Sequence, residues 1–136
     1  MTNPIGPEIY WAILTAVFTS LLWVPHILQR VVEMKPHDAL RDPEHDMPTK
    51  APWAQRAVRA HTNAMENFPL FAFFCVVIQM TGAGDSMTAT AAMIYFWARV
   101  AHYIVYTLGM PWLRTPIFAV GFGAMGAMGL RLLGML

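Results

Sequence analysis

The chain changes from a charged, proline-containing segment to a long apolar run within the sequence Arg56-Ala-Val-Arg59-Ala-His61-Thr-Asn63-Ala-Met-Glu66-Asn67-Phe-Pro69. On a helix, Arg59, Asn63 and Glu66 stand at positions i, i+4 and i+7, so their side chains project from one stripe. The same helix is expected to continue through an apolar segment that ends near Met80. Because a polar stripe at the mouth of a membrane helix needs partners, we expect those partners to indicate the function.

The composition is typical of a membrane protein. Of the 136 residues, 12% are charged and 57% are hydrophobic, and the mean hydropathy is +0.44. Soluble domains carry roughly a quarter of charged residues, and the length is that of one domain, so we expect a single membrane domain over residues 1–136 in contact with lipid. A net charge of +1 with scattered cations provides no basic face, which excludes nucleic acid as a partner.

Four apolar runs predict an all-α, integral membrane four-helix bundle without a β-sheet. We place the transmembrane helices at about residues 9–28, 55–80, 87–108 and 116–133. Residues 30–52 mix charge with repeated proline, which predicts a loop. Pro69 lies inside the second helix and is expected to bend it, whereas Pro116 suits the first turn of the fourth.

The distribution of cations predicts the orientation in the membrane. The first loop and the start of the second helix carry Arg30, Lys35, Arg41, Lys50, Arg56 and Arg59. The second loop carries no cation and the third carries Arg114, so the positive-inside rule places the first and third loops in the cytoplasm. Both termini are then expected on the non-cytoplasmic side, where Arg131 is the exception.

A second polar stripe occurs near the end of the third predicted helix. Arg99, His102 and Tyr106 stand at i, i+3 and i+7 and share a face, at the same predicted depth as the first stripe. Together the two stripes suit a small zwitterionic ligand, because guanidinium groups bind carboxylates and a carboxylate binds an ammonium group. In the alternative interpretation, Glu66 and Arg99 neutralise each other and clamp the bundle.

The histidines do not predict a metal site. His61 and His102 have no cysteine or carboxylate at a suitable spacing, so they make a weak pair of ligands. His26, His37 and His45 are expected to lie in solvent or at the membrane interface.

The motif Arg59-Ala-His-x-Asn63-x-x-Glu66-Asn-x-Pro69, followed later by Arg99-x-x-His102-x-x-x-Tyr106, resembles the MAPEG family, the membrane-associated proteins of eicosanoid and glutathione metabolism. The resemblance covers nearly the whole chain. The phrase Gly109-Met-Pro-Trp-Leu-Arg-Thr115 is most similar to the bacterial branch, which implies a bacterial inner membrane. Family membership would imply a homotrimer of four-helix subunits, with glutathione bound between neighbouring subunits near the cytoplasmic face.

The resemblance also implies the residues that bind glutathione. They are Arg59, Asn63 and Glu66 on the second helix, Arg99, His102 and Tyr106 on the third, and Arg30 or His26 at the end of the first. Glutathione would serve as a thiol cosubstrate for a transferase- or peroxidase-like reaction with a lipophilic electrophile that enters from the membrane.

The start of the fourth predicted helix departs from the family pattern. Members that form prostaglandins and leukotrienes have an arginine there beside the glutathione sulfur, whereas this chain has Phe118, Ala119 and Phe122. A nearby positive charge lowers the pKa of a thiol, so its loss counts against catalysis, although Arg114 is a candidate to replace it. Two hypotheses therefore stay open: a glutathione-dependent enzyme, and a non-enzymatic membrane subunit with an interaction or lipid-binding role.

Overall fold

The computed structural model describes residues 4–41 and 49–136, and this part of the chain is helical without a strand. Its helices are α1 (Pro7–Leu21), α2 (Trp23–Met34), α3 (Pro36–Arg41), α4 (Pro52–Thr81), α5 (Ser86–Leu108) and α6 (Pro111–Leu132). Residues 42–48 of the predicted loop lie outside the described residues. The all-α prediction is confirmed for the described part.

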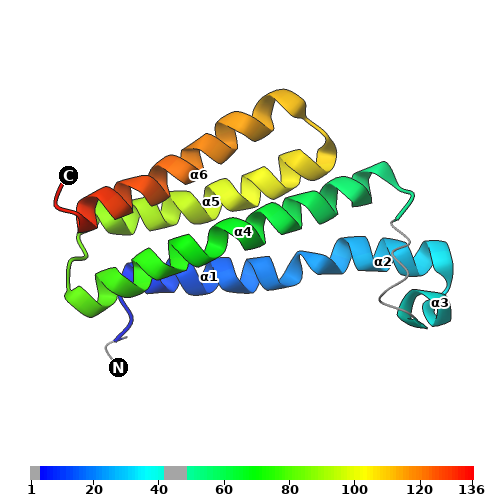
Figure 1. Ribbon diagram of the computed structural model, residues 1–136, viewed down its shortest axis with the longest axis horizontal. Helices are drawn as coiled ribbons and strands as arrows, with labels where there is room; N and C mark the ends of the chain where they lie inside the picture. The colour runs from blue at the N-terminus through cyan, green and yellow to red at the C-terminus, as the bar shows by residue number, and fades with distance from the viewer. Residues whose placement is uncertain (1–3, 42–48) are drawn as a thin grey trace.

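The long helices run up and down side by side (Figure 1). The chain passes outward through α1 and α2, returns through α4, passes outward again through α5 and returns through α6. The start of α1, the end of α6 and the α4–α5 connection lie at one end of the molecule, here called the terminal end. The short helix α3, the start of α4 and the α5–α6 connection lie at the opposite end, here called the α3 end. The first residues of α1 and the last residues of α6 therefore share one side of the bundle.

Among the described residues, three helical stretches are long and apolar enough to cross a membrane: Pro7–Met34, Pro52–Thr81 and Pro111–Leu132. They correspond to the first, second and fourth predicted spans. The third, residues 87–108, forms α5 but does not meet the same criterion. Buried polar residues such as Thr88, Arg99 and His102 reduce the hydropathy of α5 while facing the interior of the bundle. A fourth crossing therefore stays a prediction.

The first span differs from its predicted bounds. It divides at Leu22 because Pro25 has no N–H to donate to the carbonyl of Leu21, so α1 ends there and α2 begins at Trp23. The helix α2 then continues to Met34, so the prediction of a loop from residue 30 is wrong for residues 30–34 and for α3.

The side chain of Glu33 explains why this segment stays helical. Its carboxylate accepts hydrogen bonds from Gln29 Nε2 at 3.1 Å and from Thr49 Oγ1 at 2.8 Å. It also accepts from the backbone N–H groups of Lys50 and Ala51, both at 3.1 Å. One carboxylate thus supports the last turns of α2 and ties them to the chain just before α4.

Prolines set the starts of α4 and α6. The first residues of these helices are Pro52 and Pro111, earlier than predicted, because a proline in the first turn loses no hydrogen bond that the helix would otherwise make. Pro116 consequently lies inside α6, so the prediction that it opens the helix is wrong. Pro69 lies inside α4 as predicted, and the helix continues through it.

The core lies where α1, α4, α5 and α6 meet. Its buried members are mostly small or flexible: Ala12, Phe71, Cys75, Ile78, Ala91, Ala92, Tyr95, Ala124, Met125 and Met128. Small residues let membrane helices approach closely. The ring of Phe71 on α4 stacks on Tyr95 of α5 with centroids 3.9 Å apart, which fixes the part of α5 that precedes Arg99.

Candidate functional site

Arg99 in the second half of α5 is the centre of the candidate site. Its side chain is almost fully buried, with 3% of the residue exposed. Its Nη1 donates a hydrogen bond to Asn63 Oδ1 on α4 at 3.1 Å. Its Cζ lies 5.2 Å from the ring centroid of Tyr95 and 5.0 Å from that of Phe118 on α6. The guanidinium is therefore held by an amide and by cation–π contacts from three helices.

A glycine on α6 makes room for this arginine. A Cβ atom at Gly121 would lie 2.9 Å from Arg99 Nη2 and 3.3 Å from its Nε, so only glycine lets the guanidinium lie against the helix. Both Nε and Nη2 are buried and have no hydrogen-bond partner among the described residues. Because a buried charge with unsatisfied donors is costly, this position favours an acceptor that carries negative charge.

Two more side chains from the second stripe extend the site along α5. His102 is buried, with its ring 5.5 Å from that of Tyr106 and 5.9 Å from that of Phe118. Arg114, in the first turns of α6, places its Cζ 5.2 Å from the Tyr106 ring centroid. Arg99, His102 and Tyr106 thus lie together, as their spacing predicts, and α6 adds Arg114. We call these four residues and Asn63 the Arg99 cluster.

The three residues of the first stripe on α4 do not all face the interior of the bundle. Asn63 contacts Arg99, whereas Arg59 and Glu66 are exposed on α4. The interpretation that Glu66 neutralises Arg99 is wrong for the subunit, because Arg99 binds Asn63 instead. Glu66 is displaced by roughly 200° around the helix from the buried Ala64 and so faces away from α5.

A separate group of polar side chains lies where α2 packs on α4. The rings of His26 and His61 are 5.7 Å apart, and both His26 Nε2 and Arg30 Nε are buried without a hydrogen-bond partner in the described part of the chain. Of the predicted cations of the first span, His26 therefore packs on His61, and Arg30 stands four residues further along α2. In the described part of the chain, the hydrogen bond and the cation–π contacts of Arg99 are made with Asn63, Tyr95 and Phe118. Within the same residues, no group of three or more His, Cys, Asp or Glu side chains could hold a metal ion.

The family model described as MAPEG matches residues 9–134. The chain belongs to the MAPEG family. No curated protein matches it. In this MAPEG protein the matched range includes all of the Arg99 cluster and, apart from Pro7 and Glu8, the three apolar helical stretches that could cross a membrane.

Sequence reasoning on this MAPEG protein missed the surroundings of Arg99. The sequence indicates Phe118 only as an apolar replacement for a family arginine, yet its ring packs on both Arg99 and His102. Phe118 and Gly121 stand at i and i+3 and therefore share the face of α6 that meets Arg99. The spacing of an aromatic residue and a glycine on one face of a helix is the sequence signal from which this contact could have been predicted.

Proposed function

We propose that this MAPEG protein binds glutathione at the Arg99 cluster, in a homotrimer, and conjugates it to lipophilic electrophiles. The observation that carries the proposal is the buried guanidinium of Arg99, whose Nε and Nη2 lack acceptors in the described residues. Glutathione carries carboxylates, and arginine binds a carboxylate through paired N–H donors better than any other side chain. Asn63, His102 and Tyr106 would add polar contacts beside it.

The exposed members of the first stripe support a site shared between subunits. Arg59 and Glu66 each directly follow an exposed apolar residue, Val58 and Met65. These belong to a row along α4 that we call the α4 stripe: Val58, Met65, Phe73, Val76 and Met80. If α4 packs against its copies through this stripe, Arg59 and Glu66 lie at the boundary, where Glu66 can bind the ammonium group of glutathione.

The orientation of the bundle agrees with this site. The cations Arg56, Arg59 and Arg114 belong to the α3 end, and α5 would complete a fourth crossing between α4 and α6. By the positive-inside rule the α3 end faces the cytoplasm and both termini face the opposite side. Glutathione would then enter from the cytoplasm and the electrophile laterally from the membrane.

Arg114 supports the catalytic part of the proposal. A positive charge beside the thiol favours the thiolate, which is the attacking form. The thiol proton passes to solvent, the sulfur forms a bond with the electrophilic carbon, and the leaving group departs with its bonding electron pair. With an aryl chloride the products are the thioether and chloride. Arg114 lies over Tyr106, at the edge of the Arg99 cluster, where it can supply this charge.

A second candidate function is glutathione binding without turnover. It is favoured by Phe118, whose apolar ring packs on both Arg99 and His102. Ala119 and Phe122 are exposed and add neither a donor nor a charge. Such a protein would keep the anion-binding arginine and serve as an interaction or lipid-binding subunit.

Calorimetry and turnover assays test the two functions on the full-length protein in detergent. Arg99→Met should weaken glutathione binding by about 10- to 150-fold, because hydrogen bonds to a charged group contribute about 1.5–3 kcal/mol. Arg131→Met removes an arginine at the terminal end and serves as the matched control, with unchanged affinity. No glutathione binding by the unmodified protein would refute both functions.

Turnover of an activated aryl chloride then separates the enzyme from the binding subunit. In the enzyme, Arg114→Ala should reduce kcat and leave the glutathione affinity unchanged. If the unmodified protein binds glutathione but the reaction proceeds at the uncatalysed rate, the binding subunit is the correct function.

A further inference from the structure

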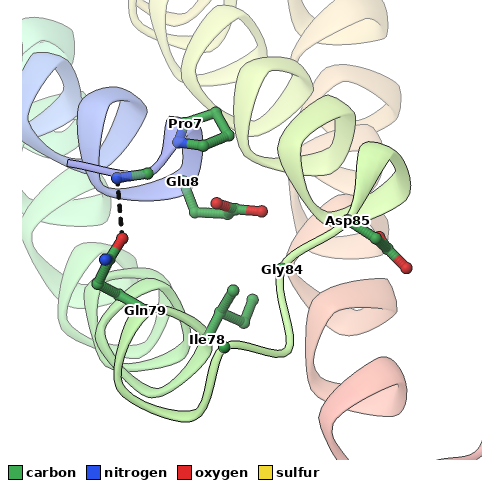
Figure 2. A pocket seen from close by; sticks show the side chains of 8 residues that line it. Pro7, Glu8, Ile78, Gln79, Gly84 and Asp85 are labelled. Atoms are coloured by element: carbon green, nitrogen blue, oxygen red, sulfur yellow. Dashed lines mark hydrogen bonds between the residues drawn. The ribbon is translucent and has the colours of Figure 1, made fainter. Parts of the chain in front are cut away.

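A buried carboxylate lies at the terminal end, far from the Arg99 cluster. Glu8 stands in the first turn of α1, and only 3% of the residue is exposed. Its Oε1 is hydrogen-bonded to Thr88 Oγ1 of α5 at 2.5 Å. Beside it opens a hollow of about 270 Å³ between the start of α1, the end of α4 and the α4–α5 connection. Figure 2 shows the Glu8 carboxylate projecting into this hollow.

The negative charge of Glu8 has no counterpart in the described part of the chain. Its Oε2 has neither a hydrogen bond nor an ion pair there. The other carboxylate of the hollow, Asp85, is already paired with Arg131 at 2.6 Å, and its side chain points away from the hollow (Figure 2). An unpaired buried charge is costly, so this hollow favours a cation.

Glycines leave the carboxylate accessible from the hollow. A Cβ atom at Gly84 would lie 3.1 Å from Glu8 Oε1 and 3.4 Å from Oε2, and one at Gly6 would lie 3.4 Å from Oε2. Gly6 is held in place because its N–H donates to Gln79 Oε1 at 2.9 Å, as the dashed line in Figure 2 marks. That bond occupies the amide oxygen of Gln79 and leaves its Nε2 as a donor at the rim.

We propose that this hollow binds a primary ammonium group, with Glu8 as the anion that accepts its N–H bonds. A hard divalent cation needs six or more oxygen ligands, and the described residues hold no metal-binding group. A primary amine needs one carboxylate and room for a short carbon chain, which Pro7 and Ile78 line with apolar surface. Gln79 Nε2 can donate to an oxygen on the same molecule.

The position of the hollow allows two sources for this ammonium group. It lies at an end of the helices, at the depth of lipid headgroups if the bundle crosses the membrane. The group can therefore belong to an aminophospholipid headgroup or to a small soluble amine. Since the Arg99 cluster lies further along α5, binding here does not depend on glutathione.

Thermal unfolding of the full-length protein in maltoside micelles, followed by tryptophan fluorescence, tests the proposal with ethanolamine as the probe. At ten times the dissociation constant, ethanolamine should raise the ratio of folded to unfolded protein about elevenfold. Choline, which has a positive charge but no N–H, and sodium chloride at equal ionic strength are the ligand controls. A second arm compares nanodiscs of phosphatidylethanolamine with nanodiscs of phosphatidylcholine.

Variants test whether the stabilisation by ethanolamine comes from binding in the hollow. Glu8→Gln removes the charge but keeps the length and a carbonyl oxygen for Thr88, so the response to ethanolamine should disappear. Gly84→Ala should reduce the response by occupying the space beside the carboxylate, and it decides the matter if Glu8→Gln does not fold. Asp38→Asn, an exposed carboxylate on α3, is the matched control and should respond like the unmodified protein.

Stabilisation by free ethanolamine that Glu8→Gln abolishes supports a soluble amine as ligand. Stabilisation only in phosphatidylethanolamine nanodiscs, again lost in Glu8→Gln, supports the lipid headgroup. The proposal is overturned if neither source stabilises the protein, if choline or sodium chloride acts as strongly, or if Gly84→Ala and the unmodified protein respond alike.

Discussion

Arg99 owes its position to residues on three helices. Asn63 satisfies one of its nitrogens, the rings of Tyr95 and Phe118 cover its faces, and Gly121 leaves it space. These neighbours contribute no carboxylate, so the guanidinium keeps its charge available to a ligand. A buried arginine held in this way is a binding group prepared in advance, because little side-chain ordering remains to be done when an anion arrives.

Replacing Glu66 tests whether the first stripe contributes to ligand binding or to the stability of the subunit. Because Glu66 is exposed and does not pair with Arg99 within the subunit, Glu66→Gln should change the free energy of unfolding of the subunit by less than about 0.5 kcal/mol. The affinity for glutathione should fall, since the partner of its ammonium group loses charge. Chemical unfolding and calorimetry measure the two effects. A loss of about 3–5 kcal/mol in stability would instead indicate a buried clamp on Arg99.

At the scale of elements, α6 meets Arg99 of α5 at Gly121 and not at Gly123. Gly121→Ala places a Cβ 2.9 Å from Arg99 Nη2, so the guanidinium must move and glutathione should bind more weakly. Gly123→Ala is the matched control, because its Cβ would meet nothing within 4 Å. Alanine in place of glycine inside a helix stabilises by about 0.5–1 kcal/mol, so Gly123→Ala should raise the unfolding free energy and keep full affinity. Equal affinity in both variants would contradict the proposed role of Arg99.

The N-terminus of α5 makes the stability depend on pH. The backbone N–H of Thr88 bonds the Asp85 carboxylate and, with Arg131, holds the pKa of Asp85 below its ordinary value of 3.8. A carboxyl whose pKa is lower in the folded state contributes stability above its unfolded pKa and loses that contribution as the pH falls through the folded value. The unfolding free energy should therefore drop as the pH falls below about 4, and Asp85→Asn should show a smaller drop. If Asp85→Asn and Asp38→Asn follow the same pH curve, Asp85 is not the responsible group.

The sequence predicts the long helices and the α5 stripe because both depend on local spacing. The apolar runs fix the existence of α1, α4 and α6, and a helical repeat suffices to place Arg99 beside His102. The sequence does not predict which proline begins α6, since Pro111 and Pro116 both suit the first turn of a helix. Nor does it separate Asn63 from Glu66, because a stripe spans a wide arc and only the contact with α5 shows which of them faces inward.

Glu8 illustrates the same limit at the terminal end. An acid in the first turn of a helix is expected to interact with the helix dipole at the surface. The chain instead buries it against Thr88, which lies far away in the sequence on α5. A tertiary contact of this kind leaves no pattern in the neighbouring sequence, so the α1 sequence by itself cannot predict it.

At the scale of the whole molecule, the α4 stripe leaves apolar side chains exposed along the helix that contributes Asn63 to the site. Such a row can face lipid or other copies of α4. The same helix has Arg59 and Glu66 exposed on the surface of the subunit. If α4 faced lipid, these two charged side chains would lie against the membrane. Charged groups at that depth normally face a partner, which favours packing against copies of the chain.

Native mass spectrometry of the full-length protein in mild detergent tests the assembly, and we expect a species of three times 15.3 kDa. Val76→Ala trims the α4 stripe and should shift the equilibrium towards monomer, because the same contact is weakened in each subunit. Val17→Ala trims a similarly exposed valine on α1 and is the matched control, with the trimer retained. Glutathione affinity should fall together with the trimer, since Arg59 and Glu66 reach the ligand only across a subunit boundary. A monomer that binds glutathione as tightly as the trimer would show that the Arg99 cluster is complete within one subunit and that the α4 stripe faces lipid.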